Sequence, residues 1–395
     1  MNWKERIINT IKGEKSDCLP FVPRLDIWYK SNRLRGTLPA KYKNSTLFEI
    51  ADDLDVGYHS VVPDFSNFLS KNSNAFLGLG IYDLQSSPYK IIHDSIDFKT
   101  TTTKEGLTSS VFYTPYGNIT TKTLYSDDMK RGGATIGHIV EHALKSKKDI
   151  ESLGYIFETI KFSENYDNFN EFKDSLKDKG AGVGFCMLSG SPMHHIMKEL
   201  ISFENFVYML NDNPSEINYL SHKIQSVFDK VMDIASKSSA EILFCGANYD
   251  SMLTWPAFFK ENITPFLKKY SAAARDNKKF FLTHADGENE GLVQEYIDAK
   301  IDIADSICPS PMTKLKIEDI RKKFDSKITI WGGLPSICVL ENSMSDYEFE
   351  KYADSFFEKL GEGTRIILSF ADTTPPDAKF ERIEKIASLA KSFKL

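Results

Sequence analysis

The sharpest chemical signal in the sequence is a histidine and an aspartate that stand two residues apart at the end of an apolar run. Lys279–Thr283 is expected to be a β-strand, and His284 and Asp286 follow it. Residues two apart on a strand point to the same side, so both heads can face one ion or one substrate. Imidazole and carboxylate together suit a divalent metal such as zinc, with Asp250 or Asp372 as a further ligand. Two alternatives stay open: a metal-free polar site, and capping of the following helix, because Asp is a common N-cap residue.

Charged residues near two N-terminal apolar runs form a second candidate group. Asp64 ends one of these runs, where a carboxylate is costly to desolvate unless it is paired or used. It is expected either to act in catalysis or to pair with Arg24, Arg33 or Arg35. Arg24 and Asp26 flank a single leucine and point to one side. They can bind an anionic group of a substrate, or neutralise each other.

Further candidates follow other predicted strands. Tyr249 stands beside Asp250, and Trp331 ends the run 328–331, so both are expected to contact the substrate. His194 and His195 open a helix, where their rings lie about 100° apart and cannot both face one site. At least one of them is expected to belong only to the start of the helix.

Alternation of short apolar runs with periodic charged runs predicts the elements that position these residues. The second half of the chain contains six such strand–helix units, and two earlier strands are expected at Phe21–Trp28 and Val56–Pro63. Eight strands alternating with helices predict a (β/α)8 barrel of the TIM type, in which chemistry collects at the C-terminal strand ends. An open doubly wound sheet is the alternative, but no GxGxxG follows the first strand. The six later strands are expected at Phe185–Leu188, Glu241–Cys245, Lys279–Thr283, Ile303–Ile307, Ile328–Trp331 and Arg365–Ser369.

Residues 88–125 depart from this pattern. Polar and apolar residues alternate over Lys90–Lys99 and Ser110–Thr123, with a turn at Tyr116-Gly117, which predicts an antiparallel β insertion or flap on the barrel. No linker or repeat divides the chain, so residues 1–395 are expected to form one domain.

Composition excludes several classes of protein. The net charge of −6, from 49 basic and 55 acidic residues, argues against a globally basic nucleic-acid binder. No stretch approaches the roughly 20 apolar residues that span a bilayer, and the N-terminus has no apolar signal core, so a cytoplasmic location is expected. The five cysteines include no CxxC pair, which argues against a Cys-rich zinc site. There is no phosphate loop, no GxSxG elbow and no DxHxxG segment of the kind that corrinoid-binding domains carry.

Four segments, in this order and spacing, resemble the uroporphyrinogen decarboxylase superfamily over nearly the whole chain. They are Gly190–Pro192, Phe281–Gly287, Ile330–Pro335, and Ile366–Ser369 followed by Pro375–Asp377. The resemblance implies a (β/α)8 barrel. It also implies one of two chemistries: cofactor-free decarboxylation of a porphyrinogen, or methyl transfer by zinc enzymes that work with a corrinoid protein. A dimer is common among such barrels.

The resemblance also bears on individual residues. The decarboxylases carry an Arg-Gln-Ala-Gly-Arg motif after the first strand, and Pro23–Tyr29 lacks it, although Asp64 is similar in position to their catalytic aspartate. The thiol-methylating branch uses a His-x-Cys pair and a later Cys as zinc ligands. Here those positions are His284, Asp286 and Asp372, so both thiolates are replaced by carboxylates. Such an oxygen-rich set is more similar to the zinc sites of ether-cleaving methyltransferases from anaerobes, and it puts a thiol acceptor in doubt.

Two enzymatic functions follow from these observations. The first is the methyltransferase component of a corrinoid-dependent demethylase. Zinc held by His284, Asp286 and Asp250 or Asp372 would act on a small methoxylated or methylated substrate, and the cobalt of a separate corrinoid protein would accept the methyl group. In this reading, Asp64, Arg24 and Tyr249 line the pocket.

The second function is a metal-free decarboxylase, a lyase acting on a small polycarboxylate. Asp64 would stabilise a protonated intermediate, and arginines would anchor substrate carboxylates. A ligand-binding barrel without chemistry is a third interpretation, which the polar residues at six or more strand ends argue against.

Overall fold

Six parallel strands from the second half of the chain form the central sheet of the computed structural model, which describes residues 1–395. Their order, β12-β11-β10-β9-β8-β7, follows the sequence, because each crossover helix places the next parallel strand beside the last one. The six predicted strand–helix units are confirmed. The strands are β7 (Val183–Met187), β8 (Ile242–Ala247), β9 (Phe280–His284), β10 (Ile303–Ile307), β11 (Thr329–Pro335) and β12 (Ile366–Ala371).

The two N-terminal strands expected at Phe21–Trp28 and Val56–Pro63 are absent. Only Phe21 forms a bridge, with Leu368 of β12, and helix α2 (Asp26–Arg35) begins inside the first range. The prolines at positions 20, 23 and 63 have no N–H and cannot donate to a strand ladder. The structure therefore contains a six-stranded parallel sheet, where the sequence predicts a closed eight-stranded barrel.

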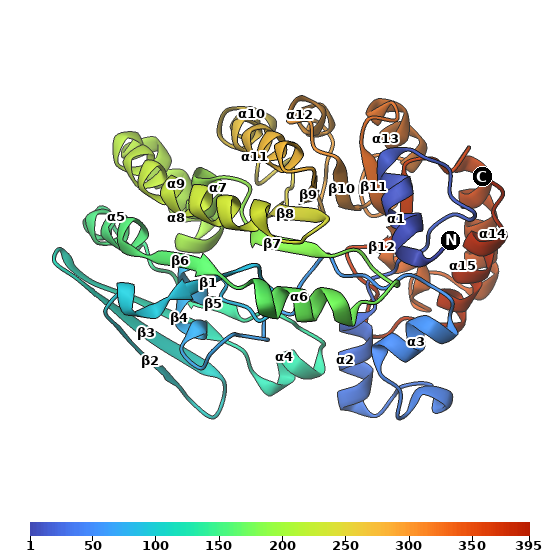
Figure 1. Ribbon diagram of the computed structural model, residues 1–395, viewed down its shortest axis with the longest axis horizontal. Coiled ribbons are helices and arrows are strands. Elements are labelled where there is room, and N and C mark those ends of the chain that lie inside the picture. The colour runs from blue at the N-terminus through green and yellow to red at the C-terminus, as the bar shows by residue number, and fades with distance from the viewer.

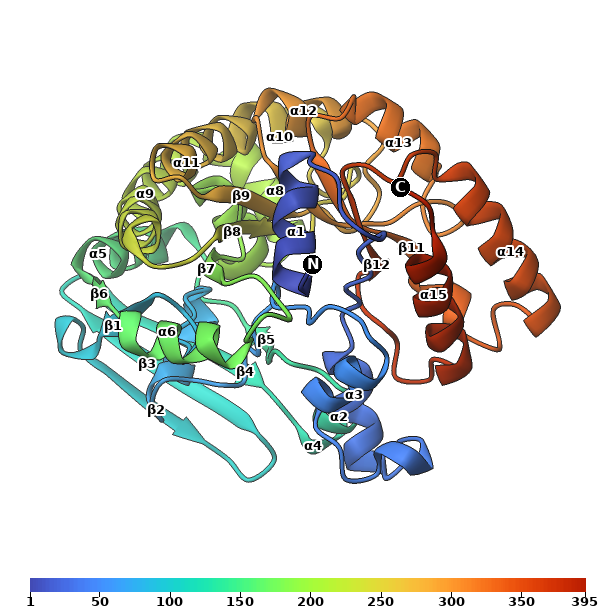
Figure 2. The same ribbon diagram turned by 45° about the vertical axis from the view of Figure 1, so that its right-hand side comes forward.

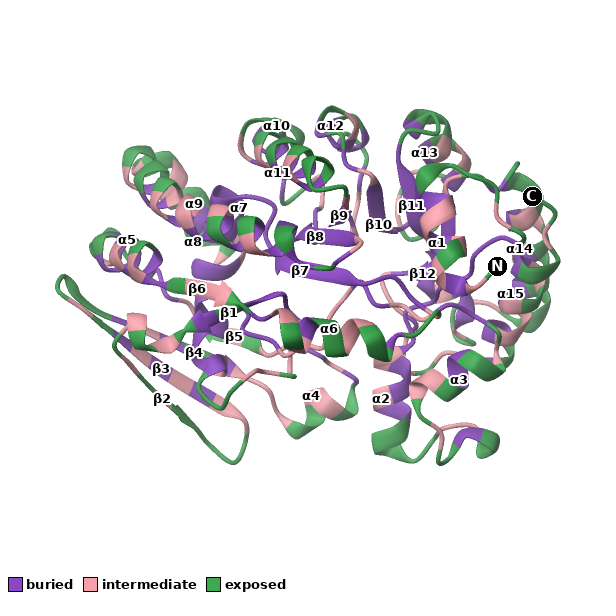
Figure 3. Cartoon of the chain, in the orientation of Figure 1, coloured by how far each residue is buried: buried purple, intermediate pink, exposed green.

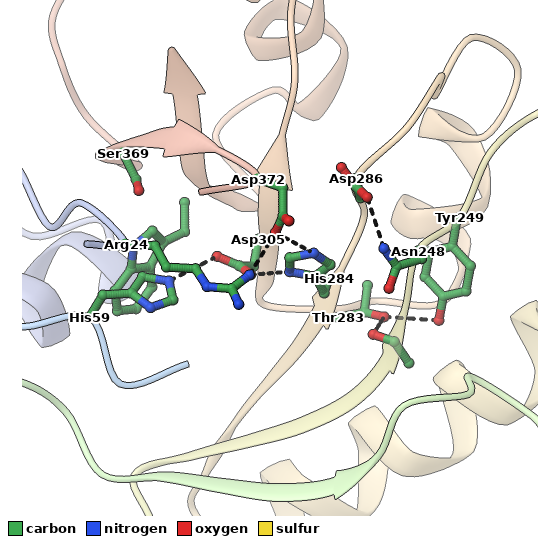
Figure 4. A network of polar contacts seen from close by, with 12 residues as sticks. Arg24, His59, Asn248, Tyr249, Thr283, His284, Asp286, Asp305, Ser369 and Asp372 are labelled. Atoms are coloured by element: carbon green, nitrogen blue, oxygen red, sulfur yellow. Dashed lines mark hydrogen bonds and ion pairs between the residues drawn. The ribbon is translucent and has the colours of Figure 1, made fainter. Parts of the chain in front are cut away.

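Isolated backbone hydrogen bonds still hold the two N-terminal segments in place. The two segments lie between β12 and the segment that leads into β7. Val22 N donates to Leu368 O at 2.8 Å, Gly57 N to Phe21 O at 3.0 Å, and Tyr58 N to Lys179 O at 2.8 Å. These contacts bring Arg24 and His59 to the end of the sheet where His284 lies (Figure 4).

Helices form an arc outside the parallel strands (Figure 2). After β7 they are α7 (Pro192–His195), α8 (Phe203–Asp212), α9 (Pro214–Lys237), α10 (Pro256–Asn262), α11 (Thr264–Asp276), α12 (Val293–Asp298), α13 (Ile317–Phe324), α14 (Asp346–Lys359) and α15 (Phe380–Ser392). The N-terminal helix is α1 (Trp3–Lys12), which begins with a capping box at Asn2 and ends at Gly13, where φ is 77°. None of the helices is long and apolar enough to cross a membrane.

The predicted antiparallel insertion is present and longer than expected. A four-stranded sheet consists of β2 (Phe98–Thr102), β3 (Leu107–Thr114), β4 (Gly117–Leu124) and β5 (His138–Glu141), and β1 (Tyr89–Ile92) pairs with β6 (Lys161–Glu164). Figure 1 shows this sheet beside the parallel strands. The remaining helices of the N-terminal half are α3 (Leu47–Asp53), α4 (Asp127–Arg131), α5 (Ile150–Thr159) and α6 (Tyr166–Ser175).

Side-chain alternation along the parallel strands divides the core into two clusters. A cluster of 19 buried residues on the inner side of the sheet includes Phe244, Leu282, Ile303 and Trp331. A larger cluster of 79 buried residues packs the other side against the helices (Figure 3). Successive strand residues point to opposite faces, so residues two positions beyond Leu282 or Ile303 point inward.

Candidate metal centre and substrate pocket

His284 and Asp305 lie side by side because of this alternation and the strand register. His284 is two residues beyond Leu282 on β9, Asp305 is two beyond Ile303 on β10, and the two are register partners. Their side chains meet with His284 Nδ1 2.6 Å from Asp305 Oδ2, at 4% and 2% exposure (Figure 4). A histidine held in this way by a carboxylate presents its other nitrogen in a fixed direction, as metal-ligating histidines do.

That other nitrogen faces two further carboxylates. His284 Nε2 lies 3.1 Å from Asp372 Oδ1, just beyond the end of β12. His284, Asp286 and Asp372 form a group whose donor atoms lie within 4.8 Å of one another. Ligands on a tetrahedral zinc with bonds near 2 Å are separated by roughly 3.3 Å, so small side-chain rotations would bring the three donors onto one ion. Three protein donors leave a fourth position open for a substrate oxygen, the pattern of catalytic zinc sites.

The charges around this group favour a cation at its centre. Burial opposes a charge on His284, but hydrogen bonds with Asp305 and Asp372 outweigh it and raise the pKa of His284 to about 10. Burial disfavours the Asp372 carboxylate, yet Arg24 and His284 hold the pKa of Asp372 well below its usual range. Burial raises the pKa of Asp286 and is only partly offset by the charge of His284.

Arg24 forms ion pairs with two aspartates of the chain itself. Its Nη1 donates to Asp372 Oδ1 at 2.9 Å and its Nε donates to Asp26 Oδ1 at 3.1 Å. Of the two roles that the sequence allows for Arg24 and Asp26, the structure shows mutual neutralisation. This contact also positions Asp372 toward His284.

Asp286 caps no helix, because α12 begins at Val293 and its N-cap is Leu292. Instead, Asn248 Nδ2 donates to Asp286 Oδ2 at 2.8 Å. Both residues have positive φ, 59° and 50°, a conformation that Asn and Asp tolerate better than most residues. The hydrogen bond therefore joins two unusual turns at the ends of β8 and β9 and orients Asp286.

Two predicted site residues lie apart from the group. The Asp250 carboxylate accepts from Met252 N at 2.8 Å and from Glu288 N at 3.0 Å, so it stabilises its own turn and joins that turn to the loop after β9. Asp64 pairs with Lys30, not with any of the three arginines considered from the sequence. It is not among the residues that line the pocket described below.

Tyr249 and Trp331 belong to the core, not to a substrate surface as expected. Both are 0% exposed. The Tyr249 hydroxyl lies 3.0 Å from Thr283 Oγ1, and a Cβ added at Gly190 or Gly246 would collide with it at 2.2 or 1.9 Å. The close fit of this phenol against two glycines explains why it points inward. Trp331 is on the inner side of the sheet and packs edge-on against His59, with ring centroids 5.7 Å apart.

Tyr249→Phe should therefore lower stability without changing substrate affinity. Loss of the phenol leaves the buried Thr283 hydroxyl with only its bond to Gly246 O, at a cost of about 1 kcal/mol. Denaturant unfolding measures this change. An unchanged unfolding free energy together with weaker substrate binding would place the phenol in the pocket after all.

A cavity of about 420 Å³ opens onto His284, Asp372 and Arg24. Its apolar walls include Phe65, Leu188 and Phe244, and residues 134–139 and His142, next to β5 of the insertion, line it as well. The insertion thus contributes to the pocket, through residues beyond the range 88–125 in which it is predicted.

Several residues of this site are not among those predicted from the sequence. Asp305 could have been found, because an acid in the middle of the apolar run Ile303–Ile307 is unusual. Lys198 and Glu199 had no such signal, since they lie in η5 (Ile196–Leu200), a π-helical turn that follows α7. Both lie at the cavity wall, where Glu199 is buried and Lys198 is half-buried, and desolvation lowers the pKa of Lys198 and raises the pKa of Glu199. His194 and His195, by contrast, are buried helix-start residues outside the lining.

Comparisons with known proteins agree with this architecture. The structure superposes on that of a methyltransferase from Methanosarcina mazei with a TM-score of 0.53 and 12% sequence identity, over 100% of this chain and 99% of the other. At this identity the likeness concerns the fold. No curated protein sequence matches the chain. The family model for uroporphyrinogen decarboxylase (URO-D) matches residues 129–393, about two thirds of the chain. The chain therefore belongs to the uroporphyrinogen decarboxylase family.

Proposed function

We propose that this protein is a metal-dependent methyltransferase that removes a methyl group from a small methoxylated or methylated substrate. The observation that carries the proposal is the meeting of His284, Asp286 and Asp372 at the edge of a largely apolar cavity. The fold similarity to a methyltransferase agrees with it.

The donor set fits a divalent metal. Asp305 accepts a hydrogen bond from Nδ1 of His284, which leaves Nε2 as the atom that can bind a metal. Hydrogen bonds from Arg24 and Asn248 orient Asp372 and Asp286. One nitrogen and two carboxylate oxygens suit zinc, with two negative charges to balance the ion. When bound, such a metal supplies Lewis-acid polarisation of a substrate oxygen.

The cavity favours a small substrate with little charge. Its volume of about 420 Å³ lies within the range of small-molecule sites, and its one arginine is already paired with two aspartates. Lys198 is then the one lysine in the lining that a polycarboxylate could reach. Because Asp64 also lies outside this cavity, the site geometry supports methyl transfer over the decarboxylase alternative.

The acceptor in this proposal is the cobalt of a separate corrinoid protein. The chain carries no DxHxxG segment for a corrinoid of its own. The apolar walls of the cavity keep water from the reacting methyl group, and one end of the substrate stays open to a large partner.

Zinc-loaded protein mixed with free cob(I)alamin and a methoxylated aromatic should convert the cobalamin to its methylated form. Absorbance spectra follow this conversion, and mass spectrometry follows the demethylated product. Protein purified without chelator should contain close to one equivalent of zinc or another transition metal. Less than a tenth of an equivalent, with no binding on reconstitution, would rule out the metal-dependent mechanism, and release of carbon dioxide from an acidic substrate would favour the lyase.

A further inference from the structure

One buried carboxylate oxygen at the cavity wall makes no hydrogen bond within the protein. Glu199 is 4% exposed, and its Oε2 accepts from the Tyr82 hydroxyl at 3.2 Å. Its Oε1 is buried and makes no hydrogen bond. Leaving a buried polar atom unpaired costs roughly 1–3 kcal/mol, so such an atom at a cavity wall points to a missing ligand.

The neighbouring lysine also has spare hydrogen-bonding capacity. Lys198 Nζ donates to Ala247 O and to Asn248 Oδ1, both at 3.3 Å. An ammonium has three N–H groups, so one remains. Lys198 Nζ and Glu199 Oε1 are 4.0 Å apart, too far for a hydrogen bond with each other. A single oxygen atom can lie about 2.8 Å from both of them.

We propose that Lys198 and Glu199 form a subsite that binds a hydroxyl group of the substrate. The hydroxyl oxygen accepts a hydrogen bond from Lys198 Nζ, and its proton is donated to Glu199 Oε1. Whichever of the two residues carries the shared proton, the pair offers one donor and one acceptor, which is what a hydroxyl requires.

Other polar groups match this pair less well. A carboxylate would gain Lys198 but would place a negative charge against Glu199 Oε1, and an ammonium would meet the opposite conflict at Lys198. An apolar group would satisfy neither Glu199 Oε1 nor the third N–H of Lys198, and a site built to bind a hydroxyl penalises such a group. A neutral hydroxyl is the group that satisfies both.

The subsite is joined directly to the candidate metal centre. The Asn248 amide accepts from Lys198 through Oδ1 and donates to Asp286 through Nδ2. The side chain of Asn248 alone thus separates the subsite from the candidate metal centre. A substrate that reaches both must carry its hydroxyl group and its methyl-bearing oxygen close together. The subsite depends on the proposed function in one respect, namely that a methoxy group of the same substrate reacts at the metal centre.

Calorimetric titration of the metal-free protein with matched probes tests the subsite separately from methyl transfer. The probes are 2-methoxyphenol, methoxybenzene, which lacks the hydroxyl, and 2-methoxybenzoate, which carries a carboxylate in its place. We expect 2-methoxyphenol to bind at least about tenfold more tightly than either of the others. Lys198→Met should reduce this preference to below about threefold.

Lys173→Met is the matched control, because Lys173 pairs with Glu241 and does not line the cavity. It should retain the tenfold preference. Equal affinities of the three probes for the wild-type protein, or no measurable binding of 2-methoxyphenol, would overturn the subsite, and this comparison needs no variant to fold. Selective binding of the phenol without methyl transfer to cob(I)alamin would retain the subsite and contradict the proposed function.

Discussion

His284→Ala should abolish metal binding and methyl transfer together. The substitution removes the one nitrogen donor of the group and leaves Asp286 and Asp372, which cannot hold zinc tightly by themselves. We expect no retained metal after dialysis, and activity below about 1% of wild type. Metal analysis and the cob(I)alamin assay on the same preparation measure both.

The structure adds a stability cost and a pH dependence to this prediction. His284 bridges the buried Asp305 and the half-buried Asp372, so its loss leaves Asp305 with only His59, 4.0 Å away, and should cost about 3 kcal/mol. His195→Ala is the control, because His195 is equally buried outside the cavity: it should lose stability but retain metal. With its pKa near 10, His284 must release a proton to bind metal, so the wild-type affinity should rise about tenfold per pH unit between 6 and 9. A flat profile would show that metal binding releases no proton from His284 in this pH range.

Asp286→Asn should lose most activity and leave the melting temperature within a few degrees. The amide oxygen of Asn can still accept from Asn248 Nδ2, and loss of the charge relieves repulsion with Asp372, so the fold is not strained. A neutral oxygen is a far weaker metal ligand than a carboxylate. Because changes to residues that only orient ligands weaken metal affinity 10- to 100-fold, a direct ligand should lose at least about 100-fold.

Asp250→Asn is the control for Asp286→Asn. It tests whether removal of any carboxylate near the ends of β8 and β9 weakens metal binding. Asp250 is the other aspartate that the sequence offers as a ligand, and its carboxylate accepts from two backbone N–H groups. It should bind metal as wild type does. Full activity in Asp286→Asn would refute ligation by Asp286, and equal loss in the two variants would show that the effect is not specific to the group.

The parallel half of the fold was predictable because its signals are local. Each strand from β7 to β12 is a short run buried on both faces and is bounded by a periodic helix, so hydrophobic periodicity alone locates it. The segments at 21–28 and 56–63 have the same apolar composition, but prolines remove donors that a ladder needs. Their position is determined instead by single hydrogen bonds to β12 and to the segment before β7, which are long-range contacts.

His284 and Asp286 could be predicted from the sequence as members of the candidate metal group, with Asp250 or Asp372 as the third. His284, Asp286 and Asp372 follow predicted strands, and the C-terminal ends of parallel strands meet at one edge of the sheet, so their proximity follows from strand placement. The residues that surround this group depend on long-range contacts. Strand register set Asp305 against His284, and the left-handed turns at Asn248 and Asp286 joined two loops. Packing against two glycines turned Tyr249 into the core, and a π-helical turn brought Lys198 and Glu199 to the cavity wall. These outcomes depend on contacts between residues far apart in the chain, and hydrophobic periodicity carries no information about such contacts.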